Sequence, residues 1–135
     1  MPASTARAAG APRVNTLWKI PRSVLVVIHT VDLQVLLMER ASYPGFWQSV
    51  TGSLDREDEP LRAAATREVG EETGLDAGAY LLEDWDLENR FEIFARGRGR
   101  FAPGITHNRE HVFGLTLPPP ARAARRTPCA PRETA

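Results

Sequence analysis

The sequence predicts one α+β domain built around a mixed β-sheet, and three observations support this. Its 135 residues are about one domain's worth. Segments with the pattern of β-strands outnumber helical ones, and the one clear helical pattern lies mid-chain instead of alternating with strands. Hydrophobic residues make up 42% and charged residues 25%, which excludes a collagen, a coiled coil or a wholly disordered chain.

The first strands are expected in the N-terminal half. Residues 23–30 are rich in β-branched side chains and predict a buried strand. Asp32 marks a turn, and residues 34–39 predict the hairpin partner of that strand. After a loop over residues 41–45, residues 46–51 predict another short strand.

Residues 60–73 predict a helix, because helix-forming residues dominate them. Pro60 suits the first turn, Asp58 is a plausible N-cap, and Gly74 is well placed to end the helix.

Further strands are expected at residues 79–86, 90–95 and 110–117. Residues 96–104 contain arginines and glycines and predict a basic, flexible loop. Residues 1–14 are small, polar and basic, so we expect a floppy arm.

Charge and composition exclude several functional classes. No apolar run approaches the length of about 20 residues that a membrane helix needs, and the N-terminus lacks the apolar core of a signal peptide. The single Cys129 cannot form an internal disulfide, so a cytoplasmic location is expected. A net charge of zero argues against a dedicated nucleic-acid binder.

The acidic residues are concentrated in one block. Residues 55–92 hold 13 of the 17 acids against four bases. On the expected helix, Glu71 and Glu72 follow Glu68 by three and four residues, so the three carboxylates project from one side and repel one another. A hard divalent cation such as Mg²⁺ would offset that repulsion. The alternative is a solvated acidic helix end.

A longer pattern is more specific than the carboxylates alone. Gly52 and Glu59 precede residues 67–75, which read Arg-Glu-hydrophobe-x-Glu-Glu-x-Gly-hydrophobe. This pattern resembles the Nudix box of the Nudix hydrolases, with six residues instead of five between Gly52 and Glu59. The resemblance implies the Nudix fold, in which the box forms a loop–helix–loop metal site beside a mixed sheet. It also implies cleavage of a phosphoanhydride in a nucleoside-diphosphate-like substrate.

The resemblance implies roles for individual residues of the box. Glu68 and Glu72 would bind Mg²⁺, with Glu71 as a third ligand and Mn²⁺ as an alternative ion. Arg67 would orient a carboxylate through a charge-assisted pair, and Glu59 would assist through the water shell of the metal.

Four further stretches resemble one branch of the superfamily, the bacterial folate-pathway pyrophosphatases that act on 7,8-dihydroneopterin 3′-triphosphate. They are residues 19–28, 46–53, 91–94 and 101–106, and the resemblance runs from about Trp18 to Leu117.

This resemblance implies a set of substrate contacts: Lys19, Arg40, Thr51, Phe91, Glu92, Ile93 and Phe94. Lys19 and Arg40 can pair with phosphates. Phe91 and Phe94 can pack against a flat pterin ring, while Glu92 can accept hydrogen bonds from ring N–H groups. On one strand, Phe91 and Phe94 would point to opposite faces, so we expect at least one of them in the core.

A competing motif is an inverted zinc-protease signature, His-x-x-Glu-His, at residues 107–111. It chelates zinc only on a helix, and on the expected strand the two histidines would stand roughly 13 Å apart. Glu110 is either an exposed edge charge or an acid that faces the metal site.

The leading hypothesis is a Mg²⁺-dependent pyrophosphohydrolase of a small-molecule triphosphate, with no nucleic-acid or membrane partner. The alternatives are a nucleoside-triphosphate pyrophosphatase acting on dATP or oxidised dGTP, and a non-catalytic or defective module. The resemblance stops after Leu117, and residues 118–135 show no apolar periodicity. We therefore expect a largely disordered tail, from a natural shortened C-terminus or an out-of-frame gene, in which the last strand and C-terminal helix of the family are missing.

Overall fold

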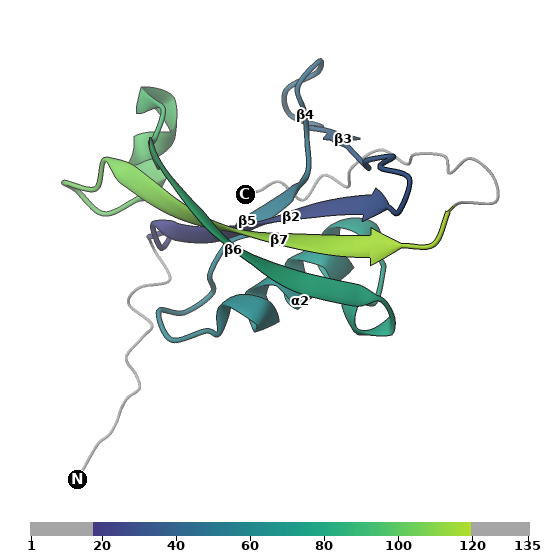
Figure 1. Ribbon diagram of the computed structural model, residues 1–135. Coiled ribbons are helices and arrows are strands. Elements are labelled where there is room, and N and C mark those ends of the chain that lie inside the picture. The colour runs from purple at the N-terminus through teal and green to yellow at the C-terminus, as the bar shows by residue number, and fades with distance from the viewer. Residues whose placement is uncertain (1–17, 120–135) are drawn as a thin grey trace, which may run out of the picture.

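The computed structural model describes residues 18–119, which form a four-stranded sheet, a two-stranded sheet and one α-helix (Figure 1). The order of strands in the larger sheet is β5-β2-β7-β6, and β3 pairs with β4 beside it. The elements are β2 (Arg22–Thr30), β3 (Met38–Glu39), β4 (Trp47–Gln48), β5 (Val50–Ser53), α2 (Leu61–Thr73), β6 (Leu81–Glu92) and β7 (His107–Leu117), with 3₁₀ helices η2 (Ala77–Ala79) and η3 (Ala95–Arg100).

The larger sheet is mixed, as the sequence predicts. β2 and β7 run parallel along their length, whereas β5 is antiparallel to β2 and β6 is antiparallel to β7. The parallel pair lies at the centre of the sheet, where both strands have a neighbour on each side. This position accounts for the β-branched run in β2, because a central strand is shielded on both edges.

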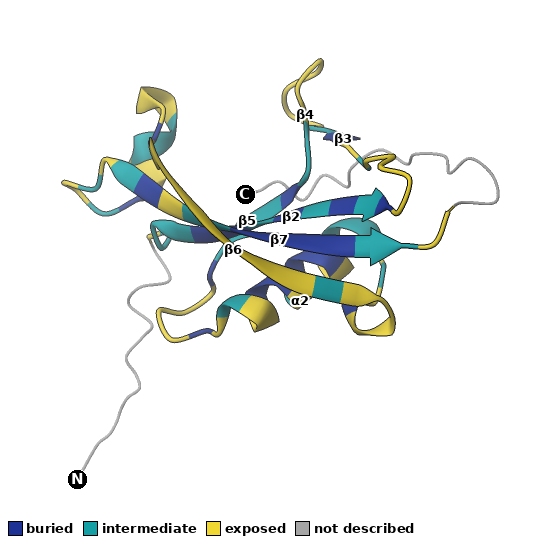
Figure 2. Cartoon of the chain, viewed as in Figure 1, coloured by how far each residue is buried: buried dark blue, intermediate teal, exposed yellow. Residues whose placement is uncertain are grey.

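The hydrophobic core lies between this sheet and α2, which packs on one face (Figure 2). Val26 and Ile28 of β2 and Leu115 of β7 meet Ala65 and Val69 of the helix, and all five are fully buried. β6, at the sheet edge, is exposed along almost its whole length. The helix therefore lies against β5 and β2, and its carboxylates are carried beside these two strands.

The two ends of α2 test two predictions. Gly74 ends the helix in the left-handed conformation, with φ of 80°, and its N–H donates to the Gly70 carbonyl, as predicted. The prediction of an Asp58 N-cap is wrong. Pro60 occupies that position without a side-chain cap, and Asp58 instead accepts a hydrogen bond from Arg56.

Several predicted strands have different bounds. The two strands expected at residues 79–86 and 90–95 are one strand, β6, with an irregularity between Asp84 and Leu87 that absorbs the residues between them. Of the strand expected at 34–39 as the hairpin partner of β2, only Met38–Glu39 forms a strand, and it pairs with β4 instead of β2. Val35 forms an isolated bridge with His29 of β2.

Three further expectations concern the basic loop, the two termini and membrane-spanning helices. Within the basic loop expected at 96–104, η3 forms a short 3₁₀ helix. The predicted arm over residues 1–14 and residues 120–135 of the predicted tail lie outside the described part of the chain. Between residues 18 and 119, no helix has the length and apolar character required to cross a membrane.

Candidate active site

The carboxylates of α2 differ strongly in exposure. Glu68 is buried, with 8% of its surface accessible, whereas Glu71 is exposed and Glu72 is half-buried. Glu68 shares its helix side with Ala64, Ala65 and Val69, the residues that face the sheet. Of the three carboxylates that the sequence places on one side of the helix, Glu68 is therefore the buried one.

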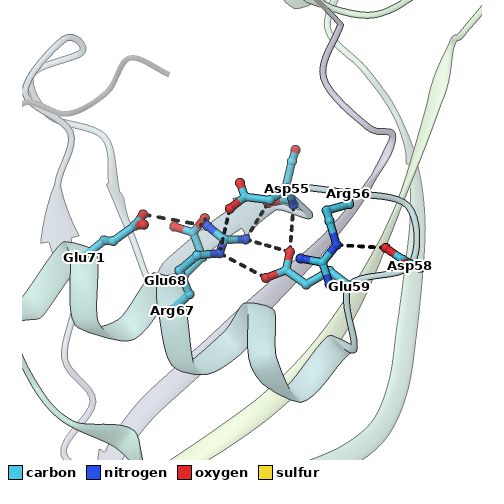
Figure 3. Close-up of polar contacts among 8 residues, drawn as sticks. Asp55, Arg56, Asp58, Glu59, Arg67, Glu68 and Glu71 are labelled. Atoms are coloured by element: carbon cyan, nitrogen blue, oxygen red, sulfur yellow. Dashed lines mark hydrogen bonds and ion pairs between the residues drawn. The ribbon is translucent and has the colours of Figure 1, made fainter. Parts of the chain in front are cut away.

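Arg67 is the hub of an ion-pair network around the start of α2 (Figure 3). Its Nε and Nη2 donate to the two carboxylate oxygens of Glu59, at 3.1 and 3.0 Å. Its Nη1 donates to Glu68 Oε2 at 2.8 Å, and Nη2 also reaches the Ser53 carbonyl at 3.2 Å. Exposed Asp55 completes the group, at 3.2 Å from Nε.

This network ties the loop before the helix to the helix itself. The backbone N–H of Asp55 donates to Glu59 Oε1 at 2.7 Å, so Glu59 joins both ends of the loop to Arg67. Burial raises the pKa of Glu59, but the hydrogen bonds from Arg67 and from the Asp55 N–H outweigh it and hold that pKa below the usual value. Burial likewise opposes the charge of Arg67, and the Glu59 hydrogen bond and the surrounding carboxylates nevertheless hold its pKa above the ordinary value.

The environment of Glu68 disfavours its charged form. Burial raises its pKa above the ordinary value, the negative charge of Glu71 adds to the rise, and the ion pair and hydrogen bond with Arg67 only partly offset them. Glu72 contributes a side-chain hydrogen bond to the same carboxyl group. Two carboxyl groups at hydrogen-bonding distance need either a shared proton or a cation between them.

The space for the Glu68 carboxylate exists because residue 52 on β5 is glycine. A Cβ added at Gly52 would lie 2.1 Å from Cδ of Glu68 and 2.2 Å from Oε2. The carboxylate thus rests directly on the β5 backbone, at the level of Val24 on β2. This close approach is a function of Gly52 that the sequence pattern alone leaves unexplained.

The donors present fit a hard divalent cation, because a buried carboxyl group with a raised pKa, hydrogen-bonded to a second carboxyl group, favours any cation that replaces a proton. Within residues 18–119 they do not already stand as a convergent group of three or more ligands. Glu68 is engaged by Arg67, and exposed Glu71 lies 3.8 Å from the same guanidinium.

A cationic group lies beside these carboxylates. Lys19 precedes β2, and its amino group lies 5.7 Å from the centre of the Phe101 ring. Burial lowers the pKa of Lys19 to about 8, with further lowering by Arg100 and Arg40, while the charge of Glu68 acts in the opposite direction. Lys19 and Arg40, far apart in sequence, therefore lie within electrostatic range of each other.

Comparison with known proteins decides the family. A model described as the NUDIX domain matches residues 19–134. The chain belongs to the Nudix family. Nudix hydrolases cleave phosphoanhydrides and generally use divalent metal ions, in agreement with the carboxylate site on α2.

Two curated Nudix relatives carry the name dihydroneopterin triphosphate diphosphatase. The protein of Escherichia coli (strain K12) is 47% identical over 107 residues, which are 77% of this chain and 71% of that protein. The protein of Haemophilus influenzae is 43% identical over 99 residues, which are 71% of this chain and 62% of that protein.

Solved structures support the same family assignment. The structure of the E. coli dihydroneopterin triphosphate pyrophosphohydrolase superposes with a TM-score of 0.73 at 44% identity, and covers 84% of this chain and 78% of that one. The MutT protein of Methanosarcina mazei, at 22% identity and a TM-score of 0.54, shows the same Nudix fold alone.

The segment from Phe91 to Phe94 overturns one expectation. Neither phenylalanine is in the core, since Phe91 is 43% exposed and Phe94 is 74% exposed. β6 is an edge strand and ends at Glu92, so Phe94 lies beyond the strand, and Ile93 between them is the buried residue. Exposed Glu92 pairs with Arg98 of η3 at 2.6 Å.

Three polar residues lie on the sheet face opposite α2: Thr51, Asn108 and Glu110. Residues paired in register share a face. Val24 pairs with Gly52 on the face of α2, so Ser23 and its partner Glu110 lie on the other face. Thr51 donates its hydroxyl to the Val24 carbonyl at 2.9 Å. Glu110 is half-buried on the central strand β7, so it is neither an edge charge nor on the face where Glu68 lies.

Asn108 was not singled out by the sequence. It is buried, its amide donates to the Ser23 hydroxyl at 2.8 Å, and its carbonyl oxygen has no hydrogen-bond partner within the described residues. Only the tertiary pairing of β2 with β7 brings these two polar side chains together.

His107 and His111 lie on β7, a strand, and do not meet. His111 Nε2–H donates to Asp84 Oδ1 of β6 at 2.6 Å, and His107 lies near the hydroxyl of Thr106. The pair lacks the helical spacing that the inverted zinc-protease signature requires.

Proposed function

We propose that this Nudix hydrolase is a Mg²⁺-dependent pyrophosphohydrolase of 7,8-dihydroneopterin 3′-triphosphate. Water adds across the phosphoanhydride next to the ester-linked phosphate, and the products are the monophosphate and pyrophosphate. The observation that carries this substrate is the 47% identity, over 77% of the chain, to an E. coli protein named for that activity. The geometry around Glu68 supports the chemistry.

Glu68 and Glu72 are the proposed Mg²⁺ ligands, with Glu71 as a third. Oxygen donors of this kind also accept Mn²⁺. When bound, the ion supplies charge neutralisation for the phosphate oxygens and a lower pKa for the attacking water. Glu68 contributes most to the proposed binding of the metal, because its carboxylate is buried and has a raised pKa, so its negative charge is the least favourable without a cation.

Arg67 and Glu59 are proposed as positioning residues. The guanidinium of Arg67 holds Glu68 in place at 2.8 Å and simultaneously binds Glu59. Glu59 in turn fixes the loop after β5 through the N–H of Asp55. This arrangement restricts the rotamer of Glu68 and so reduces the entropy lost when a ligand is bound.

Lys19 and Arg40 are proposed to bind the phosphates. A pKa of about 8 leaves Lys19 mostly charged at neutral pH, and a neighbouring polyanion would raise that pKa further. The mutual repulsion of Lys19, Arg40 and Arg100 is relieved by an anion placed among them, which favours a phosphate chain beside Glu68.

The pterin is proposed to be bound by the segment from Phe91 to Phe94 and by Thr51. Exposed Phe91 and Phe94 offer ring faces for stacking, and Ile93 anchors the segment in the fold. Glu92 can accept N–H groups of the ring when it exchanges its partner Arg98.

Steady-state turnover with Mg²⁺ tests this proposal directly. The chain is assayed on 7,8-dihydroneopterin 3′-triphosphate, dATP and 8-oxo-dGTP, with pyrophosphate release as the common readout. We expect kcat/KM for the pterin to exceed that for either nucleotide by at least about tenfold, a difference of roughly 1.4 kcal/mol. Higher kcat/KM for a nucleotide would make the chain a nucleoside-triphosphate pyrophosphatase, and binding without turnover would make it a non-catalytic module.

A further inference from the structure

Three arginines stand side by side on neighbouring strands at one end of the sheet. Arg22 of β2 pairs in register with Arg109 of β7, and Arg109 pairs with Arg90 of β6. Like charges at directly opposite positions of adjacent strands destabilise a sheet. A row of three positive charges therefore requires compensation from elsewhere.

These arginines line a cavity of about 370 Å³ on the sheet face that carries α2. Register places Arg22 two residues before Val24, on the same side of the sheet, and Val24 is part of the core against the helix. The cavity is also lined by His107 of β7 and by Leu54 and Glu57 of the loop that precedes α2.

The positive charge of this cavity is only partly neutralised by the described residues. Arg109 pairs with Glu88 at 2.8 Å. Between residues 18 and 119, neither Arg22 nor Arg90 has an ion pair, and the Nε of Arg22 is buried without any acceptor. A buried guanidinium N–H without an acceptor is unfavourable, and an anion in the cavity would satisfy it.

The cavity is distinct from the carboxylate site. None of Glu59, Arg67, Glu68 or Glu72 lines it. Arg67 donates hydrogen bonds to Glu59, Glu68 and the Ser53 carbonyl, and none of these residues lines the cavity. The Arg22 cavity and the Glu68 site thus use different side chains of the loop over residues 54–59.

We propose that the Arg22–Arg109–Arg90 cavity is a second binding site, for a small phosphate-bearing anion of the size of phosphate or pyrophosphate. Guanidinium groups present a planar fork that matches the oxygens of phosphate in bidentate fashion. A cavity of this volume accommodates a compact anion and not a folded partner. The phosphate comes from one of two sources, a free anion or the far end of the triphosphate substrate.

Calorimetric titration with sodium pyrophosphate in EDTA tests the proposal, because the chelator removes any divalent metal that would hold the anion beside Glu68. The variants are Arg22→Gln and Arg90→Gln, and Arg62→Gln on α2 is the matched control, since it removes one arginine charge away from the cavity. We expect saturable binding that weakens at least fivefold in each cavity variant and less than twofold in the control. Arg22→Lys and Arg90→Lys keep the positive charge without the planar guanidinium, so their pyrophosphate affinity should lie between that of the Gln variants and that of the control. They replace a Gln variant that does not fold.

Turnover distinguishes the two sources. If Arg22→Gln leaves KM for the triphosphate unchanged, the site takes a free anion; a raised KM with retained kcat means that the substrate reaches it. Either result supports the site when binding is lost in EDTA. Equal pyrophosphate affinity in the cavity variants and the control, or no saturable binding at all, would overturn the proposal. Because the titration needs no metal and no turnover, its failure leaves the proposed enzymatic function untouched.

Discussion

The carboxylate of Glu68 occupies the space that a side chain at position 52 would fill. A Cβ on Gly52 would lie 2.1 Å from Cδ of Glu68, a distance at which one of the two must move. Burial also raises the pKa of Glu68 above its ordinary value. The close packing of a glycine strand against an acidic helix residue therefore holds a charge in a place where water alone solvates it poorly.

Replacing Gly52 with alanine should displace Glu68 and remove activity while the domain stays folded. We expect kcat/KM to fall more than about tenfold, because even residues that only orient metal ligands are worth 10–100-fold. Gly70→Ala is the matched control: it lies on α2 with its nearest neighbour at 3.8 Å. The control should keep its activity and gain roughly 0.5–1 kcal/mol of unfolding free energy from the higher helix propensity of alanine. Equal activities of the two variants would contradict the steric role of Gly52.

Glu68→Gln should abolish most turnover and yet stabilise the metal-free protein at neutral pH. The pKa of Glu68 is raised on folding, so its contribution to stability is present below about pH 4.5 and is lost as pH rises through the folded pKa. Glutamine has no charge to lose. In EDTA, the difference in Tm between Glu68→Gln and the parent should be small at pH 4 and positive at pH 7.5.

Adding Mg²⁺ at pH 7.5 should then raise the Tm of the parent and leave that of Glu68→Gln nearly unchanged, since a ligand stabilises only the state that binds it. A Tm difference that is independent of pH, or the same response to Mg²⁺ in both proteins, would refute the assignment of Glu68 as a ligand.

Arg67→Met should be strongly destabilising, because it leaves buried Glu59 without its positively charged partner. The side chain of Glu59 is 7% exposed, and breaking a buried pair from one side costs about 3–5 kcal/mol. Arg67 is 22% exposed, so we expect a loss near the lower end of that range. Arg56→Met is the control: Arg56 pairs with Asp58 on the surface, and the loss should stay within about 1 kcal/mol. Urea denaturation of both variants measures the two values.

The pH dependence of Arg67→Met provides a second readout. Glu59 has a lowered pKa in the folded protein, so its stabilisation is present above about pH 4.5 and is lost as pH falls through the folded pKa. The penalty of Arg67→Met should therefore shrink as the solution is acidified. A constant penalty between pH 7 and pH 3 would show that Arg67 acts through packing alone.

Glu92→Ala should reduce use of the pterin substrate more than use of dATP, since a hydrogen-bond acceptor aimed at ring N–H groups discriminates between bases. We expect kcat/KM for 7,8-dihydroneopterin 3′-triphosphate to fall at least about tenfold more than for dATP. Glu88→Ala, four residues earlier on β6 and paired with Arg109, is the matched control and should affect both substrates alike. Proportional losses in Glu92→Ala would assign this residue to the Arg98 contact alone.

The sequence by itself determined the elements whose information is local. The β-branched run from Val24 to Ile28 predicts a buried strand, and Gly74 marks the helix end, because both depend on neighbouring residues in the chain. The spacing of Glu59, Arg67 and Glu68 likewise identified the box, and with it the family and the carboxylates of its helix.

Only the tertiary structure decided how those residues are paired and buried. Local pattern placed Asp58 at the helix start and one of Phe91 and Phe94 in the core, and both predictions fail because the loop network and the strand edge outweigh propensity. The Arg22 cavity, the contact of Asn108 with Ser23, and the placement of Gly52 under Glu68 all join segments far apart in sequence. Such contacts arise when burial of the shared core sets the strand register, and no window of neighbouring residues encodes that register.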